Sequence, residues 1–332
     1  MGSRSQPYLS LVLTGRNDNY GGDFRSRLQH CISNAHKQLK NAQITAEIIF
    51  VNYNSVEENE PAEQFIVWPK SYETVTIRII TVPNSIHQLL VADGLRKDVP
   101  VLEYLGKNAG IRRAKGEFIL SMNPDIILTE SLVNELKQLN RANYYRANRV
   151  DFSGDLNSKH ELKRVFLKGH DYPISHVNEI PAIVRKNKFR NAWKVFTPKI
   201  SWLLNLISVP VYYNQLGNRF HCNVSGDFML MHRDCWFELE GHNENTPISL
   251  HVDALAVVQA AHLGLKENVL NTPVFHQEHE RRYDATKVNI EFEKAYQFFE
   301  NQSALMIQQQ KPEKYNGSHW GLAKFELPEM NL

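Results

Sequence analysis

The sequence of 332 residues predicts an α/β fold, in which helices lie on both faces of a mostly parallel sheet and an irregular segment is inserted in the middle. Short apolar runs rich in β-branched residues alternate with helical segments along the first 140 residues. These runs are apolar almost throughout, as is typical of strands that are buried on both faces. Each run also ends in a polar loop, which is where open α/β sheets bind ligands.

The elements of the first half follow one another in strand-loop-helix order. Strands are expected at 9–14, at 47–52, within 72–82 and at 117–122, and helices at 24–39, 101–115 and 129–139. Thr129 is a suitable N-cap for the last of these helices, because a threonine hydroxyl can accept a hydrogen bond from the first turn. Leu132, Val133 and Leu136 then share one face of that helix.

The second half is less regular. Strands are expected at 144–152 and 223–231, helices at 233–239, 253–263 and 290–308, and an extended segment at 269–275. Between them, 151–222 has no clear period and is predicted to be an insertion or lid. We expect 1–150, this insertion and 223–332 to form one continuous domain with a shared sheet.

The composition is that of an ordinary globular protein, with 42% apolar and 22% charged residues. A net charge of +2 gives no reason to expect a nucleic-acid partner. No signal peptide and no apolar run of about 20 residues are visible in the sequence. The three cysteines, Cys31, Cys222 and Cys235, are widely spaced, which suits a reducing compartment. We therefore expect a cytoplasmic protein. The mixed basic and apolar segments 186–194 and 202–207 could contact a membrane surface, or could belong to a packed lid.

The segment Asn123-Pro124-Asp125 follows the strand expected at 117–122. A carboxylate at the carboxyl end of a parallel strand can hold a divalent cation against a diphosphate. The alternative is a simple turn, because all three residue types favour turns.

Several motifs occur in an order that resembles the GT-A glycosyltransferases, closest to the family-two-like enzymes. The resemblance rests on Thr14–Asp18, Asn52–Asn54, Lys107–Gly110, Gly116–Ile119, Asn123–Asp125, Ser225–Arg233, Trp236–Glu244, Asp253 and His276. It covers most of the chain apart from the insertion and the helix expected at 290–308. Two departures stand out: Asn123 replaces the first acid of the D-x-D turn, and His251-Val252-Asp253 replaces a pair of acids.

The resemblance implies a metal-dependent enzyme that moves a sugar from a nucleotide-sugar donor to a glycan or glycolipid acceptor, with inversion. Residues 1–150 would bind the donor and 223–332 the acceptor. Asp253 would be the base, and Asp125 would hold Mn²⁺ or Mg²⁺ with His276 or His279. The implied donor-binding residues are Thr14, Arg16, Asn17, Asp18, Asn52, Asn108, Arg112 and Asn123, and the implied acceptor-binding residues are Gly226, Asp227, His242 and Glu244.

Two other functions stay open at this stage. A sugar nucleotidyltransferase would carry a lysine in the glycine-rich loop after the first strand, and the loop 14–22 has none. A catalytically degenerate protein that only binds nucleotide sugars is suggested by Asn123 in place of an acid.

Overall fold

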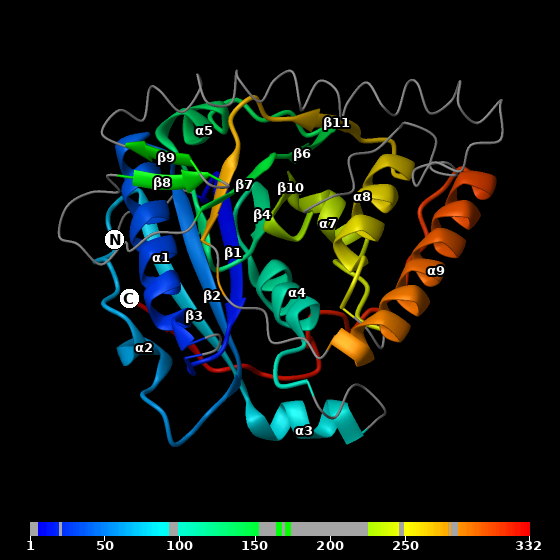
Figure 1. Ribbon diagram of the computed structural model, residues 1–332, viewed down its shortest axis with the longest axis horizontal. Helices are drawn as coiled ribbons and strands as arrows, with labels where there is room; N and C mark the ends of the chain where they lie inside the picture. The colour runs from blue at the N-terminus through cyan, green and yellow to red at the C-terminus, as the bar shows by residue number, and fades with distance from the viewer. Residues whose placement is uncertain are drawn as a thin grey trace.

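A computed structural model describes 6–19, 22–92, 99–152, 164–167, 170–173, 225–245, 249–277, 279 and 285–332. Its centre is an eight-stranded sheet with the order β11-β6-β10-β4-β1-β2-β3-β13. A three-stranded sheet, β5-β12-β7, and a two-stranded hairpin, β8-β9, accompany it. The predicted α/β class with a mostly parallel sheet is confirmed (Figure 1).

The four strands of the parallel centre match the predicted apolar runs closely. They are β1 (Leu9–Gly15), β2 (Ala46–Ser55), β3 (Val75–Pro83) and β4 (Phe118–Met122). Strand β1 pairs in parallel with β2 on one side and with β4 on the other. Because these strands run the same way, the loops after β1, β2 and β4 meet at one edge of the sheet, called here the carboxyl edge.

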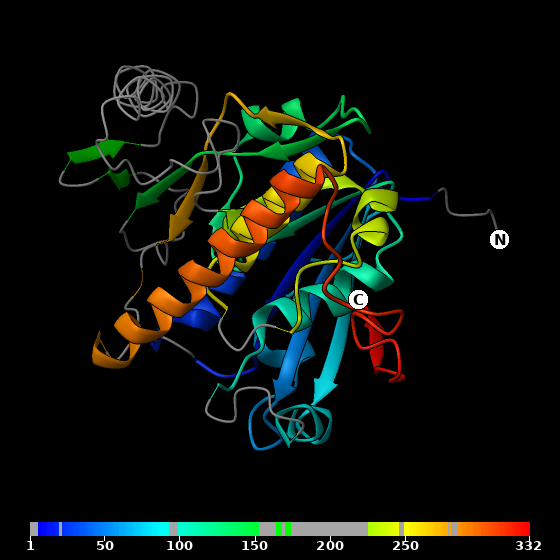
Figure 2. The ribbon, with the colours of Figure 1, turned by 90° about the vertical axis from the view of Figure 1, so that its right-hand side faces the viewer.

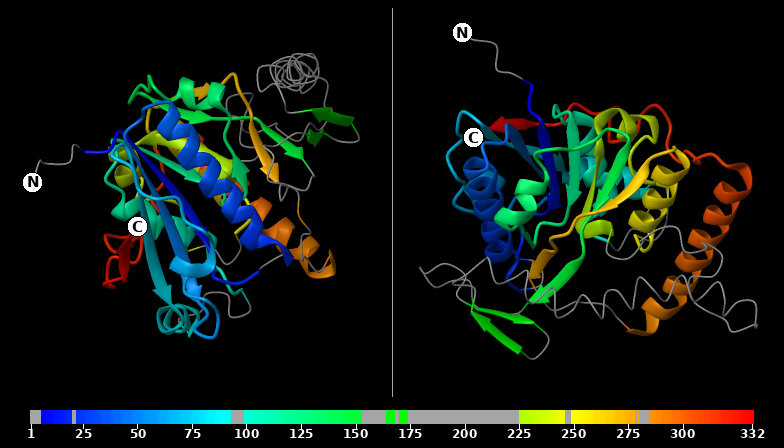
Figure 3. Two further views of the ribbon diagram at one scale, coloured as in Figure 1. Left: turned by 90° about the vertical axis from the view of Figure 1, so that its left-hand side faces the viewer. Right: turned by 90° about the horizontal axis from the view of Figure 1, so that it is seen from above.

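Helices cover both faces of this sheet. On one face the core contains side chains of α1 (Phe24–Asn41), α2 (Ala62–Phe65) and α5 (Glu130–Glu135). On the other it contains side chains of α3 (Asn84–Ala92), α4 (Glu103–Arg113), α7 (Arg233–Glu238) and α8 (Val252–His262). Figure 3 shows α1 lying across the sheet, on the opposite side from α4 and α8. The predicted N-cap is confirmed, since Thr129 Oγ1 accepts a 3.2 Å hydrogen bond from Leu132 N.

Two segments predicted to be single extended stretches are each divided between two sheets. The first forms β6 (Asn143–Arg146) in the large sheet and β7 (Arg149–Phe152) in the small one. The second, expected at 269–275, overlaps only the last residue of β11 (Lys266–Val269) and the first two residues of β12 (Val274–Gln277). Since β11 pairs with β6 and β12 with β7, both in parallel, the two segments cross from one sheet to the other together. Local sequence patterns do not reveal such a crossing.

Strand β10 (Phe228–His232) lies between β4 and β6 and is antiparallel to both. It follows the 3-10 turn η3 (Ser225–Asp227), which begins the predicted strand at 223–231. Short strand β5 (Ile126–Ile127) follows β4 directly. Residues on both sides of the insertion therefore contribute to the large sheet.

The long helix predicted near the end is α9 (Ala285–Gln309), which packs on α8 and lies in front of it in Figure 2. The chain continues beyond it to β13 (Glu329–Asn331), which the sequence analysis did not predict. This strand pairs antiparallel with β3 at the edge of the large sheet. All three β13 residues are exposed, so no apolar alternation marks the strand in the sequence.

Most of the predicted insertion, including the basic and apolar segments 186–194 and 202–207, lies outside the described residues. Of 153–222 only β8 (Arg164–Leu167) and β9 (His170–Pro173) are described, and they form an antiparallel hairpin. In the described part of the chain, no helix combines the length and apolar character that a membrane span requires.

Candidate active site

The carboxyl edge brings Asp125 and two histidines together. Asp125 follows β4 and immediately precedes β5, and β5 pairs antiparallel with β12, so that His276 lies opposite Ile126. His279 lies two residues beyond the end of β12. The carboxylate of Asp125 and the two imidazoles are about 150 positions apart in the sequence. They meet because β12 pairs with β5, which directly follows β4.

The three side chains form a compact cluster, called here the triad. Asp125 Oδ2 lies 3.5 Å from His276 Nε2 and 3.3 Å from His279 Nε2. Asp125 and His276 are buried, and His279 is partly exposed. Arg27 of α1 also reaches this carboxylate, with Nη1 3.3 Å from Oδ2.

The electrostatics of the triad favour the ionised form of Asp125. Burial alone would raise the pKa of Asp125, but hydrogen bonds and charges from His276 and His279 outweigh it and hold that pKa far below its ordinary value. Burial would likewise lower the pKa of His276, yet the hydrogen bond and charge of Asp125 raise it. The buried carboxylate is therefore ionised at neutral pH.

The triad has the chemistry of a cation site. One oxygen and two nitrogen donor atoms lie within 4.8 Å of one another. The second carboxylate oxygen, Asp125 Oδ1, is buried and has no hydrogen-bond partner among the described residues. Imidazole nitrogen together with carboxylate oxygen suits Mn²⁺ and other transition-metal ions better than Mg²⁺, which prefers oxygen. The residues present thus fit a bound divalent ion.

A chain of polar contacts lies beside the triad. Lys107 is fully buried, and its Nζ donates to Asn123 Oδ1 at 2.6 Å and pairs with Glu103 Oε1 at 2.7 Å. Asn123 Nδ2 in turn donates to Asp227 Oδ1 at 2.8 Å, while Asp227 Oδ2 pairs with Arg149 Nη1 at 2.9 Å. Because the amide oxygen of Asn123 accepts the hydrogen bond from Lys107, the amide nitrogen of Asn123 is directed to Asp227.

Asp253 is connected to this chain through the backbone of η3. It lies in the first turn of α8, as predicted, and its Oδ2 accepts a 2.6 Å hydrogen bond from Gly226 N. Lys107 Nζ donates to the carbonyl oxygen of the same Gly226 at 3.0 Å. Burial and the charge of Asp253 raise the pKa of Tyr104, which lies next to this carboxylate. Three acids expected at the site, Asp125, Asp227 and Asp253, are therefore gathered at the carboxyl edge.

The loop after β1 is held in shape by buried amides. Asn17 N donates to Asn52 Oδ1 at 2.9 Å, and Asn17 Nδ2 donates to the carbonyl oxygens of Val56 and Glu60. Thr14 is buried at the end of β1. Arg16 pairs with Asp18 at 2.6 Å, and both side chains are partly exposed. Arg16 and Asp18 are thus the members of the predicted set in this loop that can meet a ligand, whereas Asn17 and Asn52 position the loop.

Asn108 of α4 forms a cluster with His242 and Glu244 of the loop 241–244; Asn108 and His242 are buried, and Glu244 is partly exposed. Asn108 Oδ1 accepts from His242 N at 2.8 Å, and Asn108 Nδ2 donates to Glu244 Oε1 at 2.8 Å. The His242 ring lies between Tyr104 and Trp236, with 4.9 Å between ring centroids in both cases. Burial and the charge of Lys107 lower the pKa of His242 well below its ordinary value. These contacts do not support the predicted ligand contacts of Asn108 and His242, because both side chains are used in packing the loop 241–244.

Arg112 is not brought to the carboxyl edge. It lies in the last turn of α4, near the beginning of β4, and its guanidinium stacks 5.0 Å from the Trp320 ring. Since α4 and β4 are joined by a short connection, the end of this helix lies at the opposite edge of the sheet from Asp125. Its predicted contact with a diphosphate is therefore not supported by its position.

Sequence reasoning missed three cations of the site: Arg27, Lys107 and Arg149, the second of which was noted only as part of a motif. Each lies on an element that reaches the site from a different part of the chain, namely α1, α4 and β7. For Lys107, the available signal was its place in the Lys107–Gly110 motif, next to Asn108. For Arg27 and Arg149, the sequence offers nothing that separates them from other basic residues.

No protein-family model matches this sequence, and no curated protein matches it. Solved structures do share its fold. GalNAc-T7 with UDP, GalNAc and Mn²⁺ superposes with a TM-score of 0.50 at 11% identity, over 97% of this chain and 57% of that chain. Mannosyltransferase PcManGT from Pyrobaculum calidifontis, in complex with GDP-Man and Mn²⁺, gives 0.49 at 11% identity over 96% and 72% of the two chains. TarS 1–349 of S. aureus gives 0.47 at 10% identity over 91% and 71%.

The resemblance to the GT-A fold expected from the sequence motifs is confirmed at the level of the fold. At this identity the likeness defines the class of fold. The activity has to be argued from the residues at the carboxyl edge.

Proposed function

We propose that this protein is a metal-dependent glycosyltransferase that uses a nucleotide-sugar donor and inverts the anomeric configuration. The observation that carries the proposal is the triad, a partly buried Asp125–His276–His279 cluster at the carboxyl edge of a GT-A sheet, with Asp253 nearby. GalNAc-T7, which shares the fold, was solved with UDP, a sugar and Mn²⁺, and this supports a donor of that class.

The donor would lie over the carboxyl edge. Arg16 and Asp18, partly exposed after β1, would contact the nucleoside, and Asn17 and Asn52 would hold their loop in place. The triad would hold Mn²⁺ through Asp125, His276 and His279. The ion would supply Lewis-acid stabilisation of the nucleoside diphosphate as it leaves. Arg27 and Arg149 add positive charge beside Asp125 and Asp227, which also favours a diphosphate.

The acceptor hydroxyl needs a base. Asp253 is half-buried, and one of its oxygens is engaged by Gly226 N, which orients the carboxylate in the first turn of α8. Its other oxygen would take the proton from the acceptor hydroxyl as the new glycosidic bond forms. Asp227 is less suited to this task because Asn123 and Arg149 occupy both of its oxygens. It would position the acceptor, together with Gly226.

The test is a thermal-shift screen of nucleoside diphosphates with and without Mn²⁺. A ligand that binds only the folded state at about 100 times its Kd adds about 2.7 kcal/mol to the free energy of unfolding. We expect the wild type to show a shift that requires both Mn²⁺ and a nucleoside diphosphate, and Asp125→Ala to lose it. Glu326→Ala, which removes an exposed carboxylate outside the candidate active site, is the matched control and should keep the shift.

The accompanying activity assay is release of free nucleoside diphosphate from a nucleotide sugar. Release that depends on Mn²⁺ supports transfer. Consumption of pyrophosphate instead would indicate the nucleotidyltransferase, and tight binding without turnover would indicate a protein that only binds the donor. If Asp125→Ala and the wild type show an equal Mn²⁺-dependent shift, the triad does not bind the metal ion.

A further inference from the structure

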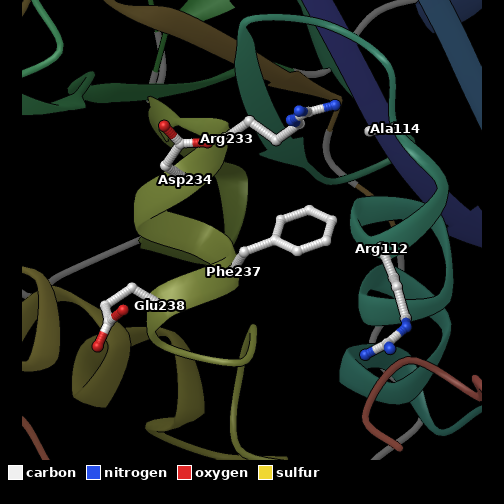
Figure 4. Close-up of a pocket in the computed structure, with 6 residues that line it drawn as sticks. All are labelled: Arg112, Ala114, Arg233, Asp234, Phe237 and Glu238. Atoms are coloured by element: carbon white, nitrogen blue, oxygen red, sulfur yellow. The ribbon is translucent and has the colours of Figure 1, made fainter. Parts of the chain in front are cut away.

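A second concave site lies between α4 and α7. It is a cleft of about 410 Å³, lined by Arg112, Ala114, Arg233, Asp234, Phe237 and Glu238 (Figure 4). Arg233 N donates to Glu117 O at 2.8 Å, so this cleft lies at the start of β4, whereas Asp125 follows its end. The five residues of β4 separate the two edges by roughly 15 Å. The cleft is therefore distinct from the proposed donor site.

The two arginines that line the cleft have no anionic partner within the described residues. Neither the Arg112 nor the Arg233 guanidinium forms a hydrogen bond or an ion pair there, although both side chains are half-buried. Neighbouring Arg113 differs, because its guanidinium donates to the carbonyl oxygens of Gly321, Leu322 and Phe325. A half-buried guanidinium with unused N–H groups is a site for an anion.

The acids of the cleft do not neutralise these arginines. Asp234 Oδ2 pairs with Arg141 at 3.3 Å, and Glu238 Oε1 pairs with Lys314 at 2.8 Å. Figure 4 shows both carboxylates directed away from the space between Arg112, Phe237 and Arg233. Burial raises the pKa of Glu244, and the charge of Arg112 offsets only part of this effect. The Glu244 carboxylate accepts its hydrogen bonds from Asn108 Nδ2 and Gly321 N and not from Arg112. The interior of the cleft is therefore positive.

Aromatic rings complete the lining. The Arg233 guanidinium carbon lies 5.8 Å from the ring centroid of Phe237, a residue that is 40% exposed. Arg112 lies 5.0 Å from the ring centroid of Trp320, and the rings of Phe237 and Trp320 meet edge to face at 5.3 Å. A guanidinium stacked on a ring keeps its N–H edge available for a planar anion. An exposed phenyl ring beside two such edges offers apolar contact to a flat ligand.

We propose that this cleft binds a small anion that carries a phosphate or carboxylate group next to a flat apolar ring. Arg112 and Arg233 bind the anionic group, and Phe237 packs against the ring. The volume is in the range of small-ligand pockets. This site is independent of the proposed sugar transfer, and its ligand requires no metal ion.

Phenyl phosphate and benzoate are the probes for the two possible sources of charge, with inorganic phosphate and phenol as the charge-only and ring-only controls. Each is titrated into the full chain by isothermal titration calorimetry at low salt. EDTA is present to keep divalent ions from the triad. We expect saturable binding of at least one aryl anion, weaker binding of both controls, and a loss of about tenfold or more in affinity in both Arg112→Gln and Arg233→Gln. The tighter of the two aryl anions identifies the favoured anionic group.

Two matched variants localise the binding. Arg25→Gln removes a guanidinium elsewhere on the surface, and Asp125→Asn alters the triad; both should bind the aryl anion as the wild type does. Phe237→Ser should weaken phenyl phosphate but leave inorganic phosphate unchanged. Thermal melts establish that the variants are folded. No saturable binding of either aryl anion to the wild type, or undiminished binding in Arg112→Gln and Arg233→Gln, would overturn the proposal.

Discussion

Glu244 provides a quantitative test of the cluster that it forms with Asn108 and His242. Its carboxyl group is largely buried, which raises its pKa from 4.5 to about 7 despite hydrogen bonds from Asn108 Nδ2 and Gly321 N and the nearby charge of Arg112. Glu244→Gln keeps an oxygen that can accept both hydrogen bonds and removes the charge. The substitution therefore isolates the cost of burying the carboxylate.

The sign of the pH effect follows from the raised pKa. Between pH 4.5 and 7 the folded protein binds more protons at this site than the unfolded chain, so its stability falls as pH rises through this range. Below pH 4.5 the carboxyl group is protonated in both states and carries no penalty. The difference between 4.5 and about 7, at about 1.4 kcal/mol for each pH unit, gives a total of about 3 kcal/mol.

The assay is urea unfolding of wild type and Glu244→Gln at pH 5 and pH 8. The variant should gain stability relative to the wild type by about 2.5 kcal/mol more at pH 8 than at pH 5. Glu58→Gln, at an exposed position, is the control and should show no such difference. If the free-energy difference between Glu244→Gln and the wild type is the same at both pH values, burial does not raise the pKa of Glu244 and this reasoning is wrong.

Four further changes test the site and the fold. Asp253→Asn should retain the Mn²⁺-dependent nucleotide shift but lose sugar transfer, and full activity in this variant would exclude Asp253 as the base. Lys107→Met leaves Asn123, Gly226 and Glu103 without their shared cation and should lower the free energy of unfolding by about 3 kcal/mol, measured in urea. Thr129→Ala removes the N-cap of α5 and should cost about 1 kcal/mol in the same assay; no change would mean that the cap is not used. Gly116→Ala would place Cβ 2.6 Å from the backbone nitrogen of Ser10, so a loss of about 2 kcal/mol is expected, and wild-type stability would show that β1 can move aside.

The parallel centre of the sheet could be predicted because its signals are local. The runs that form β1, β2 and β4 are apolar along their whole length, since both of their faces are buried by helices. Thr129 marked the start of α5 by its capping chemistry. The sequence pattern was sufficient to predict these elements, because their signals lie in residues that are close together in the sequence.

The remaining elements could not be predicted because partners distant in sequence define them. The segment 144–152 is apolar enough for one strand, but its pairing with β10 and β11 on one side and β12 on the other divides it between two sheets. Strand β13 has only exposed residues and exists because β3 offers it a free edge. Neither arrangement leaves a periodic signal.

Residue chemistry and motif order singled out Asp125, His276, His279 and Asp253 as candidates, because few residue types can bind a cation or accept a proton; the roles of these four residues stay predictions. Tertiary packing alone decided which candidates meet. The pairing of β12 with β5 brings His276 to Asp125, while Asn108 and His242, whose ligand contacts stay predictions, are buried and hydrogen-bonded to each other. The physical reason is that a side chain's type is a local property, whereas its exposure and its partners depend on where every other element of the chain folds.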